Sequence, residues 1–386
     1  MTDVRVNRKA ADRVASGHPW IFSSDVVDKG DATPGAVVRV LDPAARPLGT
    51  AHFSEASQIS LRMLSRRAEE ITPEFFRQRI GAAEEYRRRV VRDSNAYRVV
   101  YGEGDLLPAL VVDRYADYLV IQTLNQGMDY AKDTILAALV ALFSPAGIVA
   151  RNDAPVRSRE ALPLESAVVY GEVPDTVHVQ MNGLRLEADL LRGQKTGIFL
   201  DQRENYLATA RYARGKVLDC FTSTGGYAVH AAARCESVEA VDSSAPALAT
   251  AARNAASNGI NNIEFREADA FELLAGYSSA RRQFSTVILD PPAFAKSRRN
   301  LEGAARGYKE INLRALRLLG PGGILVTCSC SHHLSEAALL EVVAEASLDA
   351  NRQVRVLERR TQSQDHPILL TVPETHYLKC LILEVL

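Results

Sequence analysis

The sequence contains few cysteines and no long hydrophobic run, and these absences exclude several classes of protein. Its five cysteines are an odd number and all lie in the second half of the chain, which does not fit a disulfide framework. They also lack the paired Cys-x-x-Cys spacing of a zinc site. No apolar segment approaches the ~18 residues that span a bilayer, and the basic N-terminus lacks the apolar core of a signal peptide. We therefore expect a cytoplasmic protein with no membrane partner and no metal.

Neither sign of charge dominates the sequence. There are 46 basic and 47 acidic residues, and the resulting net charge of −1 is weak evidence against a nucleic-acid partner. The distribution of charge matters more than the sum, and the basic residues are grouped. The groups are Arg66–Arg67, Arg87–Arg89, Arg151 with Arg157 and Arg159, Arg281–Arg282, and Lys296 with Arg298 and Arg299. Taken singly, each group is typical of a solvated surface.

The pattern of apolar segments and turns predicts three domains in the 386 residues. Residues 1–70 contain short strand-like segments separated by turn signals, which favours a compact β-barrel. Residues 71–180 mix helical and strand patterns, as in an α+β domain. In residues 181–386, short apolar strands alternate with helices from about residue 216, which is typical of a parallel sheet covered on both faces. The predicted fold class is therefore α/β, with a Rossmann-like domain at the C-terminal end.

Three acidic residues mark the ends of successive strands in the C-terminal domain. Asp219 ends the first strand, Asp242 follows 23 residues later at the end of the second, and Asp269 ends the third. Ligands of open α/β sheets bind outside the carboxyl ends of the strands, so these carboxylates are expected to line one crevice. The spacing between the first two is close to that of a ribose-binding acid.

The loop after the first strand distinguishes between cofactors. It reads Phe221-Thr222-Ser223-Thr224-Gly225-Gly226 and is not the Gly-x-Gly-x-x-Gly sequence of a dinucleotide site. A cofactor without phosphate needs carboxylates for its hydroxyl and ammonium groups, but no phosphate cradle. This combination favours S-adenosylmethionine (SAM), with Phe221, Thr224 and Gly225 beside it, although the loop alone would fit an ordinary strand-to-helix turn equally well.

The next two strands end in residues that could carry out chemistry. Asp290 is followed by Pro291-Pro292, which fix a rigid, extended exit from the strand. The fifth strand ends in Thr-Cys-Ser-Cys-Ser, where Cys328 is expected to face the crevice. Carbon 5 of a pyrimidine becomes nucleophilic when a thiolate adds at carbon 6, so we predict Cys328 as the nucleophile. Asp290 would hydrogen-bond the base near N3; the group that removes the carbon-5 proton is unassigned.

These motifs resemble a known family, the bacterial large-subunit (23S) ribosomal RNA cytosine-5 methyltransferases of the three-domain type. GHPWIF (17–22) is similar to the family's signature in an N-terminal PUA-like RNA-binding domain, and YGEGDLLPALVVDRY (101–115) to its central domain. The catalytic-domain motifs that match are GQKTGIFLDQREN (193–205), DCFTSTGGY (219–227), DPPAF (290–294), TCSCSHH (327–333), DHP (365–367) and PETHYLK (373–379).

The resemblance implies a class I SAM methyltransferase domain, a ribosomal RNA substrate and particular site residues. It implies cofactor contacts from Asp201, Gln202 and Arg203 in addition to the three strand-end acids and Asp290. It allows a homodimer. Two departures, Ala109 in place of a common glycine and the weakly aromatic loop 222–224, lie away from the expected chemistry and would fit a different target nucleotide. Ala293 stands where many RNA cytosine-5 methyltransferases have a second cysteine for product release, and whether Cys330 replaces it is left open.

Several alternatives remain. Asp-Pro-Pro with a nearby aromatic residue also resembles nitrogen methyltransferases, so methylation of a nitrogen or of a guanine is the second hypothesis; Cys328 would then be a core residue. A non-catalytic RNA-binding or ribosome-assembly factor is the third, and a small-molecule methyltransferase would leave the first two domains without a purpose. For RNA binding, the expected backbone contacts are Lys9, Arg13, Arg66, Arg67 and the Lys296–Arg299 loop. Tyr227 and Phe294 could stack on a base or pack in the core.

Overall fold

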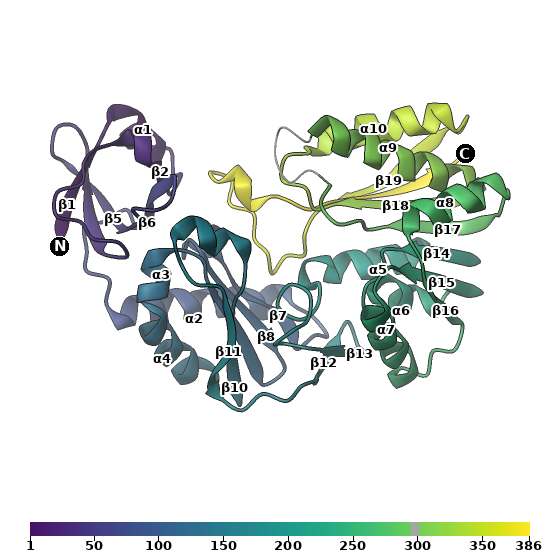
Figure 1. Cartoon of the computed structure of the whole chain (residues 1–386), viewed down its shortest axis with the longest axis horizontal. Helices are drawn as coiled ribbons and strands as arrows, with labels where there is room; N and C mark the ends of the chain where they lie inside the picture. The colour runs from purple at the N-terminus through teal and green to yellow at the C-terminus, as the bar shows by residue number, and fades with distance from the viewer. Residues whose placement is uncertain (295–300) are drawn as a thin grey trace. The chain divides into compact units, whose positions relative to one another are not determined.

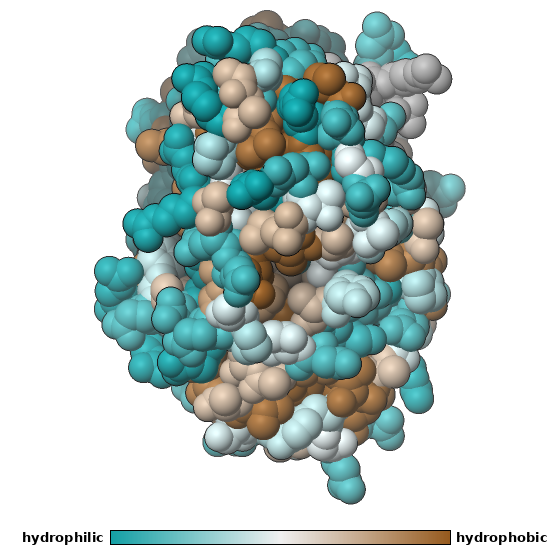
Figure 2. All heavy atoms as spheres, turned by 90° about the vertical axis from the view of Figure 1, so that its left-hand side faces the viewer, coloured by the Kyte–Doolittle hydropathy of each residue, from teal (hydrophilic) through white to brown (hydrophobic). Residues whose placement is uncertain are grey.

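A computed structural model of the chain describes residues 1–294 and 301–386, and these form two compact units. Unit 1 comprises 1–179, 188–198 and 364–375, and unit 2 comprises 180–187, 199–363 and 376–386. The expected Lys296, Arg298 and Arg299 contacts lie outside the described residues. No helix among those described is long and apolar enough to cross a membrane. On the face in Figure 2, hydrophobic side chains form small groups among hydrophilic ones.

The N-terminal part of unit 1 is a six-stranded mixed sheet with one helix. The strand order is β2-β6-β5-β4-β1-β3. Val4, Val38 and Ile21 lie in its apolar core, and α1 is capped by the Asn7 side chain, which accepts from the Ala10 backbone N–H. The elements are β1 Thr2–Val6, α1 Arg8–Ala15, β2 Trp20–Phe22, β3 Val26–Asp28, β4 Val37–Leu41, β5 Pro47–Phe53 and β6 Ile59–Ser65.

The rest of unit 1 is a five-stranded sheet of order β11-β10-β9-β8-β7 with helices against it (Figure 1). Phe76 and Ile80 of one helix and Leu139 of another pack on Val99 and Ile121 of the strands. The elements are α2 Pro73–Val90, β7 Ala96–Tyr101, β8 Leu110–Tyr115, β9 Tyr118–Thr123, α3 Gln126–Tyr130, α4 Lys132–Phe143, β10 Gly147–Asn152 and β11 Glu165–Gly171. A two-stranded sheet, β12 Val177–Met181 with β13 Leu184–Ala188, links the units along the chain.

Unit 2 is the predicted Rossmann-like α/β layer structure. Its sheet has the order β16-β15-β14-β17-β18-β20-β19; the first five strands are parallel, and β20 runs antiparallel between β18 and β19. Figure 1 shows α8, α9 and α10 on one face and α5, α6 and α7 on the other. The elements are α5 Arg203–Tyr212, β14 Lys216–Cys220, α6 Gly226–Ala232, β15 Ser237–Asp242, α7 Ala245–Ser257, β16 Ile263–Glu267, α8 Ala270–Ser279, β17 Phe284–Leu289, α9 Leu301–Arg317, β18 Leu319–Ser329, α10 Glu336–Asp349, β19 Val354–Arg360 and β20 Lys379–Val385.

Candidate active site

The carboxyl ends of the parallel strands bring the predicted acids to one edge of the sheet. Asp219 is the penultimate residue of β14, and Asp242 is the last residue of β15. Asp290 directly follows β17, and Asp269 lies two residues beyond β16. The register places Asp219 beside Ile288 of β17 and Ala240 of β15. A ligand at this edge would therefore meet carboxylates from neighbouring strands.

The loop between β14 and α6 contains residues with positive φ, and hydrogen bonds to Asp219 and Asp242 hold it in place. Phe221, Ser223 and Gly225 all have positive φ, at 65°, 50° and 84°. The Thr222 hydroxyl donates to Asp219 Oδ2 at 2.6 Å, and the Ser223 backbone N–H donates to Asp242 Oδ2 at 2.8 Å. Left-handed residues that are not glycine need such surrounding contacts to persist.

Asp219 is buried and its charge is incompletely compensated. Burial, and then the nearby Asp290 carboxylate, raise the pKa of Asp219 to about 7, while the Thr222 hydrogen bond opposes the shift. Its Oδ1 atom makes no hydrogen bond of normal geometry within the described residues, although the Ala228 backbone N–H is near enough to favour the charged form. A buried carboxylate oxygen of this kind is stabilised by a donor from a ligand. The hydroxyl and ammonium groups of SAM are such donors, so these residues fit the cofactor.

The acids at the second and third strands also have local structural roles that sequence reasoning missed. Asp242 Oδ1 accepts from the Ser244 backbone N–H at 2.9 Å. Asp269 caps α8, because its Oδ1 accepts from the backbone N–H groups of Phe271 and Glu272 at 2.8 and 3.0 Å. An Asp directly before a helix is a recognisable N-cap signal. Each carboxylate keeps lone pairs for a further donor.

The Asp201-Gln202-Arg203 segment is buried at the start of α5, and one of its side chains, Gln202, contacts Asp290. Gln202 Nε2 donates to Asp290 Oδ1 at 3.0 Å. Gln202 Oε1 accepts from Asn205 Nδ2 at 2.7 Å and from the Tyr227 hydroxyl at 3.1 Å. The amide is thereby fixed in one orientation, and it presents its donor to the carboxylate.

Asp201 and Arg203 have other neighbours. Asp201 Oδ2 accepts from the Tyr377 hydroxyl at 2.5 Å, and Arg203 pairs with Glu204 at 3.2 Å. Tyr377 and Asn205 were not singled out from the sequence, although both stand inside motifs that were. Among the described residues, no group of three or more His, Cys, Asp or Glu side chains could hold a metal.

Cys328 lies in the interior of the sheet. It is opposite Cys380 of β20, is 0% exposed, and has its Sγ 3.3 Å from the Tyr227 hydroxyl. Burial raises the pKa of the Cys328 thiol well above its usual value, and Cys380 and Asp290 add to the shift. These surroundings favour the neutral thiol, which is a poor nucleophile.

Cys330 has different surroundings just beyond the end of β18. It is only partly buried, and it interacts electrostatically with Lys379. The Lys379 ammonium donates to the backbone oxygens of Ser331 at 2.6 Å and Tyr377 at 2.7 Å. Burial lowers the pKa of Lys379 to about 8, and the charge of Cys330 opposes that shift. A neighbouring cation favours the thiolate.

The residues predicted to stack on a base or to contact RNA differ in how far they are buried and in whether they form ion pairs. Tyr227 is 3% exposed, and its ring centroid lies 4.7 Å from that of Tyr206, so it is a core residue. Phe294 is partly exposed and packs against Tyr308, with centroids 4.6 Å apart. Of the N-terminal cations, Arg13 pairs with Asp25 at 3.0 Å and Lys9 with the same carboxylate at 3.6 Å, whereas Arg66 and Arg67 are exposed.

Known proteins with this fold identify its class. One family model, described as a PUA-like domain, matches residues 4–66, and another, described as an S-adenosylmethionine-dependent methyltransferase, matches residues 155–380. A protein described as a methyltransferase and solved with SAH, and a Streptococcus mutans protein described as a SAM-dependent methyltransferase, superpose with TM-scores of 0.86 and 0.85. Each is 20% identical, and each match covers all of both chains. The fold is thus that of a class I SAM-dependent methyltransferase with an N-terminal PUA-like domain, and SAM is its cofactor.

Sequence similarity narrows the class to a family. The ribosomal RNA large subunit methyltransferase I of Shewanella amazonensis is 41% identical over 377 residues, which cover 95% of each chain. That of Tolumonas auensis is 40% identical over 375 residues, covering 95% of this chain and 94% of its own. The chain therefore belongs to the ribosomal RNA large subunit methyltransferase I family.

Proposed function

We propose that this protein transfers the methyl group of SAM to carbon 5 of a cytosine in large-subunit (23S) ribosomal RNA. Its relatives are named as large-subunit ribosomal RNA methyltransferases, which supports the substrate class. The observation that carries the cytosine-5 assignment is a thiol next to a buried cation at the end of β18, at the sheet edge where Asp290 follows β17. A nitrogen needs no covalent activation of this kind, whereas carbon 5 does.

In this proposal, the chain's own residues activate and hold the base. A thiolate adds to carbon 6 of the cytosine, and carbon 5 becomes nucleophilic. Asp290, oriented by Gln202 at 3.0 Å, hydrogen-bonds the base near N3. After carbon 5 has taken the methyl group that SAM supplies, an unassigned proton acceptor removes the proton from carbon 5, and the thiolate leaves carbon 6. The target must be unpaired or flipped out of its stack to reach the sheet edge.

The surroundings of the two thiols favour Cys330 over the sequence prediction, Cys328, as the group that adds. Cys328 is fully buried, which raises the pKa of its thiol, whereas Cys330 is partly exposed and interacts electrostatically with Lys379. Cys328 remains the alternative nucleophile. For the cofactor, we propose contacts from the residues at the same edge and from the segment that starts α5: Asp201, Gln202, Arg203, Asp219, Phe221, Thr224, Gly225, Asp242, Asp269 and Asp290. The three-domain division at residues 70 and 180, and the homodimer, stay predictions.

The test is to find both the methylated base and the residue attached to it. Ribosomal RNA methylated with labelled SAM is mapped by mass for wild type, Cys328→Ser and Cys330→Ser. Loss of the nucleophile should lower the rate at least about a thousandfold, and RNA containing 5-fluorocytidine should trap that cysteine in a covalent adduct. An adduct at Cys330 with a silent Cys328→Ser supports our assignment, and the reverse result restores the sequence prediction.

Other results would replace the proposal. Methylation of a nitrogen or a guanine that survives both substitutions would establish the second hypothesis, which the Asp-Pro-Pro sequence with nearby Phe294 favours. SAM binding without methylation of any RNA would support a non-catalytic RNA-binding or ribosome-assembly factor.

A further inference from the structure

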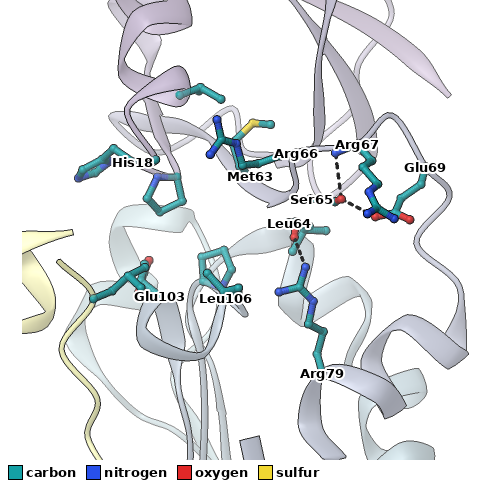
Figure 3. A pocket seen from close by; sticks show the side chains of 15 residues that line it. His18, Met63, Leu64, Ser65, Arg66, Arg67, Glu69, Arg79, Glu103 and Leu106 are labelled. Carbon is teal, nitrogen blue, oxygen red and sulfur yellow. Dashed lines mark hydrogen bonds between the residues drawn. The ribbon is translucent and has the colours of Figure 1, made fainter. Parts of the chain in front are cut away.

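Unit 1 contains a cavity of about 460 Å³ between its N-terminal six-stranded part and the helix and loops beside its five-stranded sheet. One wall is the turn after α1 and the exit of β6, and the other consists of α2, the turn after β7 and the 364–375 segment. In Figure 3, His18, Met63 and Arg66 lie on one side of the hollow, and Glu103, Leu106 and Arg79 lie on the other. None of the residues proposed for methyl transfer lines it.

Hydrogen bonds between the two walls fix the cavity. Trp20 Nε1 donates to Glu103 Oε1 at 2.8 Å, and His18 Nε2 lies 3.1 Å from Glu374 Oε2. The rings of His18 and Trp20 pack edge to face with centroids 5.3 Å apart. Because the walls are held before any ligand arrives, binding requires little further ordering of the chain. Each of these bonds engages one oxygen of its carboxylate, Glu103 Oε1 or Glu374 Oε2.

Three guanidinium groups surround the opening: Arg66, Arg67 and Arg79. Arg66 Nη2 donates to the Ala15 oxygen at 3.2 Å, and Arg79 Nη2 donates to the Leu64 oxygen at 3.4 Å. Within the described part of the chain, no carboxylate lies at ion-pair distance from these arginines; Glu69, also on the wall, accepts from the Ser65 hydroxyl and attracts the Arg79 guanidinium electrostatically. A guanidinium has five N–H donors, so the single hydrogen bonds of Arg66 and Arg79 leave each of them further donors for a ligand.

The floor beside these cations is apolar. It includes Met63, Leu106, Pro108 and Leu369, and Leu106 is 47% exposed at its edge. A small inorganic anion would leave this floor uncovered. A ligand with a flat apolar part and an anionic part would use both, and the volume falls within the ~300–1,000 Å³ range of small-molecule sites.

We propose that this cavity binds one unpaired nucleotide of the RNA, with the base on the floor around Leu106 and the phosphate between Arg66 and Arg79. The inference rests on the RNA substrate of the proposed function. Duplex RNA keeps its bases inside the stack, so only a single-stranded or bulged nucleotide can enter. The site would then fix a second point of the RNA, separate from the base that is methylated.

The test compares binding of a 12-nucleotide single-stranded RNA of mixed sequence with that of the same sequence annealed to its complement. The variants are Arg66→Ala, Arg79→Ala and Leu106→Trp, whose ring would fill the space above the floor. Arg89→Ala is the matched control, because Arg89 is an exposed arginine on the same helix as Arg79 but does not line the cavity. Loss of one charge-assisted phosphate contact should weaken single-strand binding about tenfold, and Leu106→Trp should do so without lowering duplex binding.

Two outcomes would overturn the inference. Variants that bind single strands as tightly as Arg89→Ala does would show that the cavity takes no nucleotide. An equal loss for duplex and single strand would show that the arginines contact only the backbone. Neither readout depends on methyl transfer, so a different methylated base would refute the proposed function and leave this result standing. Thermal unfolding of each variant checks that it is folded.

Discussion

Two cysteines separated by a single residue have opposite environments at the end of β18. The Cys328 side chain faces Cys380 and Tyr227 inside the sheet, whereas Cys330 follows the strand and lies near the Lys379 ammonium. Reactivity of a thiol depends on its thiolate fraction, which burial lowers and a neighbouring cation raises. The position of the cation therefore matters as much as the presence of a thiol.

Replacing Lys379 by methionine should shift activity to higher pH. Without the ammonium, the Cys330 thiolate loses a stabilising charge, so the methylation rate at pH 7 should fall roughly tenfold, as for a pKa change of about one unit, and should recover as the pH rises. Lys379→Arg, which keeps the charge, is the control. A pH–rate profile that is unchanged in Lys379→Met would mean that this cation does not support the nucleophile.

Asp219 should make cofactor binding depend on pH. Its pKa is raised to about 7, so without a ligand the carboxylate is mostly protonated below that pH. If the charged form accepts hydrogen bonds from SAM, the affinity for SAM should increase roughly tenfold between pH 6 and 8, as measured by calorimetry.

The cofactor-free protein should lose stability as pH rises from about 4 to 7, because Asp219 binds its proton more tightly in the folded state than in the unfolded state. Asp219→Asn should abolish both dependences, and a variant that keeps them would exclude Asp219 as their source.

At the scale of the element, the first residue of α6 must be glycine for packing. A Cβ on Gly226 would lie 2.4 Å from Cζ of Tyr206, whose ring is buried among Tyr227 and His230. Gly226→Ala should therefore destabilise the protein by about 1–3 kcal/mol, measured by urea unfolding. Gly276→Ala in α8 is the matched comparison, since a Cβ there meets nothing within 4 Å; it should stabilise by about 0.5–1 kcal/mol. Equal effects at the two positions would contradict this packing argument.

The alternation of strands and helices, and the acids at strand ends, could be predicted because both depend on local sequence. Asp219, Asp242 and Asp290 lie at or directly after the ends of apolar strands, and parallel strands bring their carboxyl ends together whatever the loops between them. The difference between Cys328 and Cys330 could not be predicted in this way. It depends on β20, which pairs with β18 from about fifty residues further along the chain and supplies both Cys380 and Lys379.

At the scale of the molecule, the two units are not consecutive pieces of the sequence. Unit 1 includes residues 364–375, which lie between β19 and β20 of unit 2 along the chain. The DHP motif, assigned from the sequence to the catalytic domain, is in this segment. Long-range contacts within unit 1, rather than the local pattern, decide where such a segment belongs.

Asp365 is the residue whose loss should show what this segment contributes to unit 1. It is fully buried, its Oδ2 accepts from the Arg98 backbone N–H at 2.9 Å, and its backbone oxygen accepts from Arg87 Nη2 at 2.8 Å. Arg87 is itself buried and paired with Asp105. Asp365→Ala removes the acceptor of a partly buried N–H, so local opening of β7 should become easier by about 1–3 kcal/mol.

Hydrogen exchange resolved by residue would measure this effect directly. Amide protection along β7 should fall in Asp365→Ala, while protection in β14 and β17 and the affinity for SAM should stay as in wild type. Gln364→Ala is the control, because its exposed side chain is adjacent in sequence. Unchanged protection of β7 would show that the 364–375 segment packs in unit 1 without stabilising it. A loss confined to β7 would show that the segment stabilises unit 1, although along the chain it lies between β19 and β20 of unit 2.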